Sequence, residues 1–371
     1  MFLYLSNATV SFACFLLDEA DFECDRKTLV KALISFRRNI RVRHDIRREA
    51  LLSFDHSPWA KLELASNDSA YRKVTGLSIR AFQLLSEILS SCPKFHSRFR
   101  NTGLTPRAIA GIVLVYMRNP CHEQMIQLMF GITRSAANRY INQALRMLND
   151  TLSNHSKSRV SWPSEFDMER FAGLIAKKKE CLRPFHVFGF VDGIRLLMGN
   201  FSDPAKQNAY YQFHEKSACV GNVVAFGPDG CCFWYHVNAP GSWHDSKIAE
   251  KLYVKLQNPH RTPARFRLVA DSGFRSLGGK LLITRKEKTT EEQKAICSIR
   301  QSAEHSNNNT IKSNWRRLEL RLGTNLLKNK LIIQLAIFLT NFKVRVDGVG
   351  QVATYYSSDI PQIQDLLGKY C

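Results

Sequence analysis

The stretch that decides the fold reads FHVFGFVDGIRLLMG and covers residues 185–199. Two apolar runs rich in β-branched and aromatic residues flank an Asp-Gly pair, and such runs are typical of strands. Phe185–Val191 and Ile194–Gly199 are therefore predicted to be strands, with Asp192 ending the first. An Asp-Gly pair between two apolar runs is also the standard signal for a two-residue hairpin. Taken alone, Asp192 therefore has an ordinary turn explanation beside a functional one.

Further strands and helices follow along the chain. Thr290 opens a Thr-Glu-Glu-Gln sequence that is typical of a capping box, so a helix is expected there. The order of elements predicts an α/β (α+β) domain, a mixed sheet flanked by helices. The remaining expected strands are Ser217–Phe226, Cys231–Val237, Arg265–Ala270 and Leu281–Thr284, and a further helix is expected from Gly241 to Leu256.

The region before these strands has the apolar period of helices. Thr105-Pro106 is a strong start signal, with Thr as the N-cap and Pro in the first turn. A second helix is expected at Cys121–Phe130, a tight turn at 131–133, and a third helix at Arg134–Leu148 with Thr133 or Ser135 as its cap. Helix, short glycine turn and helix is the geometry that places a second helix in a DNA major groove.

The helix after this turn offers side chains that read phosphates and base edges. Because helical hairpins are common in proteins, the motif alone favours an ordinary packing role over DNA binding. The candidate DNA-binding residues are Arg134, Ser135, Asn138, Arg139, Asn142 and Gln143.

The charge of the chain favours a polyanionic partner. Lys and Arg number 53 against 32 Asp and Glu, which gives a formal net charge of +21. Each phosphate that such a surface neutralises releases condensed counterions, so nucleic acid is the expected partner. An anionic membrane surface is the competing partner, but no segment reaches the roughly 20 uncharged apolar residues that span a bilayer. No membrane partner is expected.

These patterns divide the chain into five parts. Residues 1–60 form a basic N-terminal extension of unknown function, 61–150 the helical region, 151–184 a connector, 185–345 the sheet domain and 346–371 a C-terminal tail. Within the extension, residues 26–50 are predicted to form a helix with a basic face, for which solvation, phosphate contact and nuclear import stay open. The ten cysteines show no CxxC pair and no paired Cys/His spacing, so no zinc site is predicted. Reduced thiols in a nuclear or cytosolic protein fit best.

Four acids of the sheet domain stand at the ends of predicted elements. Asp192 and Asp271 end strands, Asp245 opens a helix, and Glu304 lies within a later helix. Mg²⁺ prefers hard oxygen ligands, and a two-ion site needs carboxylates that converge from separate elements. Singly, each acid is better explained by a turn, a helix start or a solvated helix face. Their joint order is much more specific than any one of them.

Residues 187–320 resemble the DDE endonuclease domain of the PIF/Harbinger transposases and of the Harbinger-derived nucleases. The Pro-Gly-Ser-Trp-His-Asp-Ser sequence is the most specific part of the resemblance. The segment from Tyr71 to Leu148 is similar to the helical region that precedes this domain in the family, helix-turn-helix included. The matching segments are FVDGIRL, NAYYQFHEKSACVGNVVAFGPDG, NAPGSWHDSKI, LVADSGF and RQSAEHSNNNTIKSNWRRL.

The resemblance implies an RNase H-like fold and a divalent-metal-dependent DNA endonuclease or transposase. In the family, three ligands of Mg²⁺ or Mn²⁺ lie on the first strand, just after the fourth strand, and on a later helix. That pattern assigns Asp192, Asp271 and Glu304 as the catalytic, metal-binding residues of this chain. Asp245 would then be a further metal ligand or a structural cap.

Three neighbouring residues would support the site. His244 would orient a phosphate or water, or pack in the core. Arg300 precedes Glu304 by four residues and shares its helix face, so it would pair with the carboxylate or contact DNA. Lys312 matches a later lysine of the family and would touch a phosphate.

One departure from the family bears on activity more than on fold. Ala303 replaces a β-branched residue, and the run 306–310 (SNNNT) replaces a glycine, which predicts an interruption of the helix just beyond Glu304. A domesticated, catalytically inactive DNA-binding protein is therefore the alternative, although all four acids are retained. An RNase H-like nuclease that acts on RNA or on hybrids is a third interpretation, which the helix-turn-helix makes less attractive.

The resemblance also implies partners and a location. DNA at the ends of a mobile element is the expected partner. A Myb-like accessory protein and a homo-oligomer are left open. The expected location is the nucleus, with the cytoplasm as an alternative.

Overall fold

The computed structural model describes residues 30–31, 46, 48–93, 95, 99, 104–120, 123–277, 279–284, 290–304, 310–348 and 350–357. The chain forms two compact units, Met1–Ala50 and Leu51–Cys371. In the first unit, the described residues include a short 3-10 helix, η1 (Arg48–Ala50). The helix predicted at 26–50 lies mostly outside the described residues. The second unit contains all the elements below.

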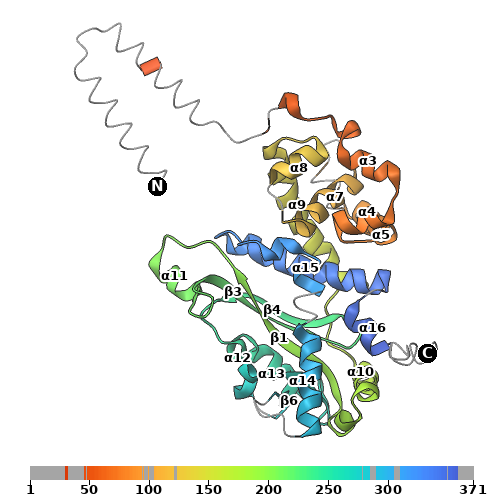
Figure 1. The fold of residues 1–371 in the computed structure, drawn as a ribbon, viewed down its shortest axis with the longest axis vertical. Helices are drawn as coiled ribbons and strands as arrows, with labels where there is room; N and C mark the ends of the chain where they lie inside the picture. The colour runs from red at the N-terminus through yellow and green to blue at the C-terminus, as the bar shows by residue number, and fades with distance from the viewer. Residues whose placement is uncertain are drawn as a thin grey trace, which may run out of the picture. The chain divides into compact units, whose positions relative to one another are not determined.

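The sheet of the second unit is mixed, as predicted. In the described part of the chain it has six strands in the order β2-β3-β1-β5-β6, with β4 also paired to β3 (Figure 1). β1, β3 and β4 pair antiparallel, whereas β5 runs parallel to both β1 and β6. The strands are β1 (Val187–Leu197), β2 (Tyr211–Gln212), β3 (Ser217–Phe226), β4 (Cys232–Pro240), β5 (Arg267–Ala270) and β6 (Leu281–Ile283).

The two strands predicted at 185–199 are a single strand. β1 runs through Asp192 and Gly193, which pair with Val224 and Val223 of β3. The prediction that Asp192 ends a strand is therefore wrong, and so is the hairpin alternative. β3 is buried along all of its ten residues, so its pairing with β1 holds the Asp-Gly pair extended against its local turn preference.

Helices cover both faces of the sheet. One face packs on α10 (Glu165–Lys178), α12 (Asp245–Ile248) and α13 (Glu250–Gln257). The other packs on α14 (Glu291–Glu304), α15 (Leu326–Asp347) and α16 (Gln351–Ser357). The helix predicted from Gly241 to Leu256 begins only at Asp245. It is divided into α12 and α13, because the backbone of Ala249 leaves helical geometry between them (φ −85°, ψ 1°). α11 (Pro204–Tyr210) and the 3-10 helices η3 (Glu180–Phe185), η4 (Ser272–Leu277) and η6 (Arg316–Glu319) connect these elements.

Two helices of the helical region begin where the sequence predicts, at Pro106 and at Arg134. The hydroxyl of Thr105 accepts the N–H of Ala108, and that of Thr133 accepts the N–H of Ala136, so Thr133 rather than Ser135 is the cap. Gly131 has a φ of +62°, which glycine adopts without strain, in the turn between the last two helices. The helices are α3 (Pro58–Ala65), α4 (Asp68–Thr75), α5 (Ile79–Ser90), α7 (Pro106–Arg118), α8 (Glu123–Phe130) and α9 (Arg134–Asn154).

α15 belongs to the core of both the helical region and the sheet domain. It packs against α5, α9 and β4, and Figure 1 shows it between the early helices and the sheet. The side-chain amide of Asn149 on α9 donates to the carbonyl of Leu331 at 2.9 Å. The indole N–H of Trp315 donates to the hydroxyl of Thr340 at 2.9 Å. Although α15 is long and rich in apolar residues, none of the described helices meets the length and hydropathy of a membrane span.

Candidate functional site

The pairing of β1 with β5 brings two of the predicted acids together. Phe190 pairs with Val269 in a parallel register. Continuing that register by two residues sets Asp192 beside Asp271, which directly follows β5 as predicted. Because neighbouring strands lie about 4.8 Å apart, the two carboxylates belong to one end of the sheet.

Asp192 lies on the sheet face that α14 covers. Side chains alternate along a strand, so Asp192 shares a face with Phe190. The ring of Phe190 lies 6.4 Å from that of Tyr356, whose hydroxyl is 3.0 Å from the hydroxyl of Ser302 on α14. These contacts link the face of Asp192 to the last turn of α14, where Glu304 is found.

α14 packs on β1 and β5, the two strands that carry or precede Asp192 and Asp271. α14 also contacts η3, which precedes β1. Burial raises the pKa of the Cys181 thiol in η3, and the charge of Glu291 in the first turn of α14 adds to this shift. The 14 residues of α14 span about 20 Å, and the five steps from Val187 to Asp192 span about 17 Å. These lengths are compatible with Glu304, the last residue of α14, lying at the level of Asp192.

The carboxylates at this end of the sheet are engaged by near neighbours. Glu304 accepts Nη1 of Arg300 at 2.7 Å, which confirms the predicted pairing. Oδ1 of Asp271 accepts the N–H of Gly273 at 2.8 Å. Among the described residues, no three His, Cys, Asp or Glu side chains are arranged to hold a metal ion. The donor chemistry of the acids suits Mg²⁺ or Mn²⁺, and Glu304 and Asp271 would have to turn from these partners to bind it.

Asp245 lies on the opposite face of β1 from Asp192. A Cβ placed on Gly193 would meet Oδ2 of Asp245 at 2.5 Å, so the carboxylate lies where a side chain would otherwise be. Only glycine allows so close an approach to the strand. As predicted, Asp245 is the first residue of α12.

Arg195, which was not among the residues predicted from sequence, holds Asp245 in place. Its Nη2 donates to Oδ1 of Asp245 at 2.7 Å and to the carbonyl of Trp243 at 2.8 Å, and Nη1 donates to the carbonyl of Gly241 at 3.1 Å. The Arg195 and Asp245 side chains are only 17% and 23% exposed. The one signal in the sequence is position, because Arg195 shares a strand face with Gly193, two residues earlier. This ion pair fastens the Pro-Gly-Ser-Trp-His-Asp-Ser segment to β1.

The charges at this end of the sheet act on one another. Burial raises the pKa of Asp245 above its usual value, the charge of Arg195 partly opposes this, and the charge of Asp271 adds to it. α12 packs against η4, which follows Asp271. Asp245 is therefore an electrostatic neighbour of Asp271 while being held from the far side of β1.

The supporting residues are only partly where they were expected. His244 is exposed, so the interpretation that it packs in the core is wrong: the side chain precedes the first turn of α12 and faces outward. Trp243 is half-buried, and the ammonium of Lys247 lies 4.3 Å from its ring centre. Lys312 is half-buried in the turn at 310–312. The interruption predicted beyond Glu304 lies in 305–309, outside the described residues.

The predicted DNA-binding residues of α9 divide into two groups. The side-chain amide of Asn138 donates to a carboxylate oxygen of Glu123 at 2.7 Å, and Gln143 is half-buried. The hydrogen bond of Asn138 joins α9 to α8. The remaining four residues, Arg134, Ser135, Arg139 and Asn142, are exposed.

Comparison with known proteins bears on the sheet domain. None of the curated proteins matches the chain significantly. A chain in the crystal structure of a pre-cleavage Mos1 transpososome matches with 10% sequence identity and a TM-score of 0.22, over 84% of this chain and 100% of that chain. Residues 191–341, which include all four acids, match a family model described as a DDE superfamily endonuclease. Over these residues the chain is similar to the DDE superfamily endonucleases.

Proposed function

We propose that this chain is a divalent-metal-dependent DNA endonuclease of the Harbinger transposase type. The observation that carries the proposal is the parallel register of β1 and β5, which continues to Asp192 on β1 and Asp271 directly after β5. Glu304, at the end of the helix α14 that packs on both strands, would complete the set. The match to the DDE superfamily endonucleases supports the reaction class. The Harbinger assignment rests on the sequence motifs, above all Pro-Gly-Ser-Trp-His-Asp-Ser.

The strand order supports an RNase H-like fold. When the two-residue β2 is left aside, β1, β3 and β4 form an antiparallel set, and β5 and β6 extend it in parallel with β1. Asp192 is then on the first strand, Asp271 follows the fourth, and Glu304 lies on a later helix. This is the arrangement of ligands that the resemblance implies.

Each group near the site then has a distinct role. Asp192, Asp271 and Glu304 would hold Mg²⁺ or Mn²⁺, which supplies Lewis-acid stabilisation of phosphoryl oxygens when bound. Asp245 is a positioning residue, because one of its oxygens is engaged by Arg195 and the carboxylate approaches β1 from the other face. The exposed residues of α9 and Lys312 would contact the DNA backbone.

Cleavage of DNA by the purified full chain tests the proposal. Supercoiled plasmid and inverted-repeat duplexes are incubated with Mg²⁺ or Mn²⁺, and nicking is measured for the wild type and for D192N, D271N and E304Q. Since the loss of even an outer partner of a metal ligand typically costs about 10–100-fold, each variant should lose at least ~100-fold. E215Q, at an exposed acid of the same domain, is the matched control and should cut normally.

Two results would count against the proposal. DNA binding without cutting, at every metal concentration, would favour the inactive DNA-binding protein instead. Cutting that survives D192N would reject the assignment of the site. Thermal melts of each variant show whether a lost activity reflects a lost fold.

The remaining assignments follow from the same proposal. The helical region at 61–150 would bind DNA through its helix-turn-helix, and 185–345 would form the catalytic domain. The ends of a mobile element would be the substrate and the nucleus the location, with a Myb-like accessory protein and self-association as further candidates.

A further inference from the structure

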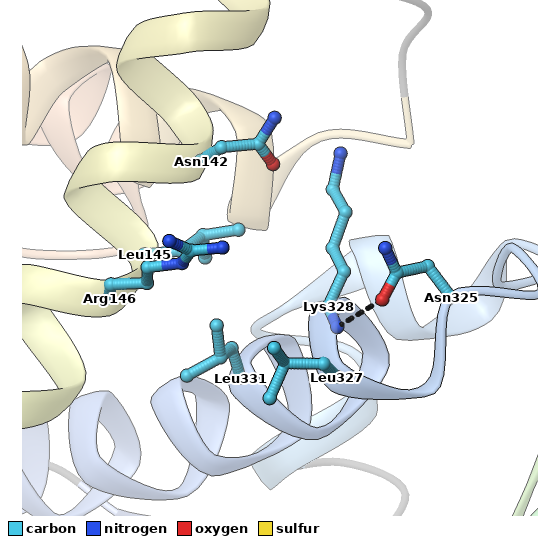
Figure 2. Close-up of a pocket in the computed structure, with 7 residues that line it drawn as sticks. All are labelled: Asn142, Leu145, Arg146, Asn325, Leu327, Lys328 and Leu331. Atoms are coloured by element: carbon cyan, nitrogen blue, oxygen red, sulfur yellow. Dashed lines mark hydrogen bonds between the residues drawn. The ribbon is translucent and has the colours of Figure 1, made fainter.

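A pocket of about 320 Å³ lies between α9 and the beginning of α15 (Figure 2). One wall comes from the helical region and the other from the last long helix of the sheet domain. The lining combines three leucines with polar and cationic groups, and it contains no acid. The lining residues are Asn142, Leu145, Arg146, Asn325, Leu327, Lys328 and Leu331.

The two cations of the pocket come from different helices. Figure 2 shows the Arg146 guanidinium and the Lys328 side chain extending into the same space, from α9 and α15. Among the described residues, neither side chain forms a salt bridge, and Arg146 is exposed. The Lys328 ammonium lies 5.8 Å from the centre of the Tyr116 ring.

The charge of one acid outside the lining, Glu123, acts on Lys328. Burial lowers the pKa of Lys328, the charge of Glu123 opposes the shift, and that of Arg317 adds to it. The Glu123 carboxylate accepts the amide of Asn138 at 2.7 Å. Two positive charges therefore share the pocket without a counter-charge in its lining, which favours an anionic occupant.

The side-chain amides of Asn142 and Asn325 also suit an anionic ligand. Oδ1 of Asn325 accepts the N–H of Lys328 at 3.0 Å, which turns one end of the amide towards the helix. Asn142 is exposed at the rim, and Figure 2 shows its amide on the same side of the pocket as the Lys328 ammonium. Arg, Lys and Asn side chains are the groups that commonly bind DNA phosphates.

The pocket lies along an exposed stripe of α9. Ser135, Arg139, Asn142 and Arg146 follow one another at helical spacing, and all four are exposed. From the first to the last, the helix rises about 16 Å, which matches roughly five base pairs of duplex. A duplex on this stripe would bring its backbone to the place where α15 adds Lys328.

We propose that this pocket binds a phosphate of the DNA backbone. The α9 stripe and the sheet domain would then contact the same DNA strand. The pocket would therefore set the position of the DNA relative to the candidate site. The inference rests on the proposed function in taking DNA as the partner, but it does not require that the DNA be cut.

Equilibrium binding without cleavage tests this pocket. Anisotropy of a labelled 20-base-pair duplex is measured in EDTA for the full-length wild type, R146Q, K328Q and the double variant, across a series of salt concentrations. Since each lost phosphate contact reduces the slope of log K against log salt by about 0.9, the double variant, which loses the one phosphate of the pocket, should lose about 0.9 units of slope. Each single variant should bind about three- to tenfold more weakly at moderate salt. K61Q, at an exposed cation of α3, should bind as the wild type does.

The outcomes separate the pocket from the endonuclease. Unchanged affinity and slope in the double variant would overturn the pocket, even if D192N abolishes cutting. Pocket-dependent binding by a chain that never cuts would support the pocket and reject the proposed activity. If K328Q melts well below the wild type, R146Q and R146E decide the matter, since Arg146 is an exposed side chain. Equal losses in K61Q and R146Q would also overturn the proposal, because they would show a general effect of charge.

Discussion

Two arginine–carboxylate pairs stand near the candidate site, and they have the same length but different surroundings. Arg195 and Asp245 are 2.7 Å apart with side chains 17% and 23% exposed, and they join a strand to a helix that begins 50 residues later. Arg300 and Glu304 are also 2.7 Å apart, but they are 29% and 44% exposed and lie on one turn of α14. The first pair is enclosed by two elements, whereas the second is open to water.

The difference shows that distance alone does not give the role of an ion pair. Breaking a buried pair leaves a charge without its partner in a poorly solvated place, which costs several kcal/mol, whereas an exposed i,i+4 pair is worth only about 0.3–0.5 kcal/mol. Asp245 is therefore fixed as part of the framework. Glu304 can exchange its arginine for another cation at little cost, which the proposed role as a metal ligand would require.

The substitution R195M should have the largest effect on stability. It leaves the Asp245 carboxylate without its cationic partner and removes three hydrogen bonds. The free energy of unfolding should therefore fall by about 3–5 kcal/mol. Denaturant unfolding followed by circular dichroism measures the change. The double variant R195M/D245L should recover a large part of it, because no buried charge is then left alone. A loss below about 1 kcal/mol in R195M would place this pair with the exposed ones.

Gly193→Ala should be the next largest change. Its Cβ would meet Oδ2 of Asp245 at 2.5 Å, and Arg195 prevents the carboxylate from moving away, so a loss of about 1–3 kcal/mol is expected. The matched control is Gly173→Ala on α10, where a Cβ meets nothing within 4 Å and alanine should stabilise the helix by about 0.5–1 kcal/mol. If both variants shift unfolding in the same direction, the close approach at Gly193 does not constrain the strand.

Lys343 differs from both arginines, because its partner is a neutral amide and not a carboxylate. Burial, and then the charge of Arg118, lower the pKa of Lys343 to about 8, although Asp347 opposes the shift, and the ammonium donates to Oδ1 of Asn314 at 2.9 Å. Between pH 8 and its ordinary value of 10.5, the unfolded chain binds the proton more tightly than the folded one. The stability of the wild type should therefore rise with pH in this window, relative to K343M, by on the order of 1 kcal/mol.

Denaturant unfolding of both proteins at pH 8 and pH 10 measures this difference. A wild type that loses stability relative to K343M over the window would show that the folded state holds the ammonium charged.

Arg300→Gln should have the smallest effect. The pair with Glu304 is partly solvated, so the free energy of unfolding should change by less than about 0.5 kcal/mol. The same denaturation experiment measures it, with E304Q as the reciprocal variant. A change in the free energy of unfolding above about 1.5 kcal/mol would show that this exposed pair stabilises the fold as much as a buried pair does. The two pairs would then not differ as proposed.

The features that could be predicted from the sequence are those with local causes. Thr105 and Thr133 cap helices because the acceptor and donor are three residues apart. Asp271 follows a strand and Arg300 pairs with Glu304 for equally local reasons. The mixed sheet also followed from the order of apolar runs.

The features that could not be predicted have distant causes. The Asp-Gly pair at 192–193 has a strong local turn signal, and only its pairing with β3 keeps it extended. Gly193 is required because the carboxylate of Asp245, on α12, lies where its side chain would be. Arg195 is one of 53 Lys and Arg residues, and nothing in its immediate neighbours marks it as the partner of that carboxylate.

The position of α15 has a consequence for synthesis. α5 and α9 leave the ribosome early, yet part of the surface that they bury is covered by α15, which is translated much later. At about 5–20 residues per second, the ribosome needs roughly ten to forty seconds to pass from the end of α9 to the end of α15. During that interval the early helices expose apolar surface that a chaperone would recognise. A nascent chain released before Leu326 would therefore lack the helix that completes the fold of its own beginning.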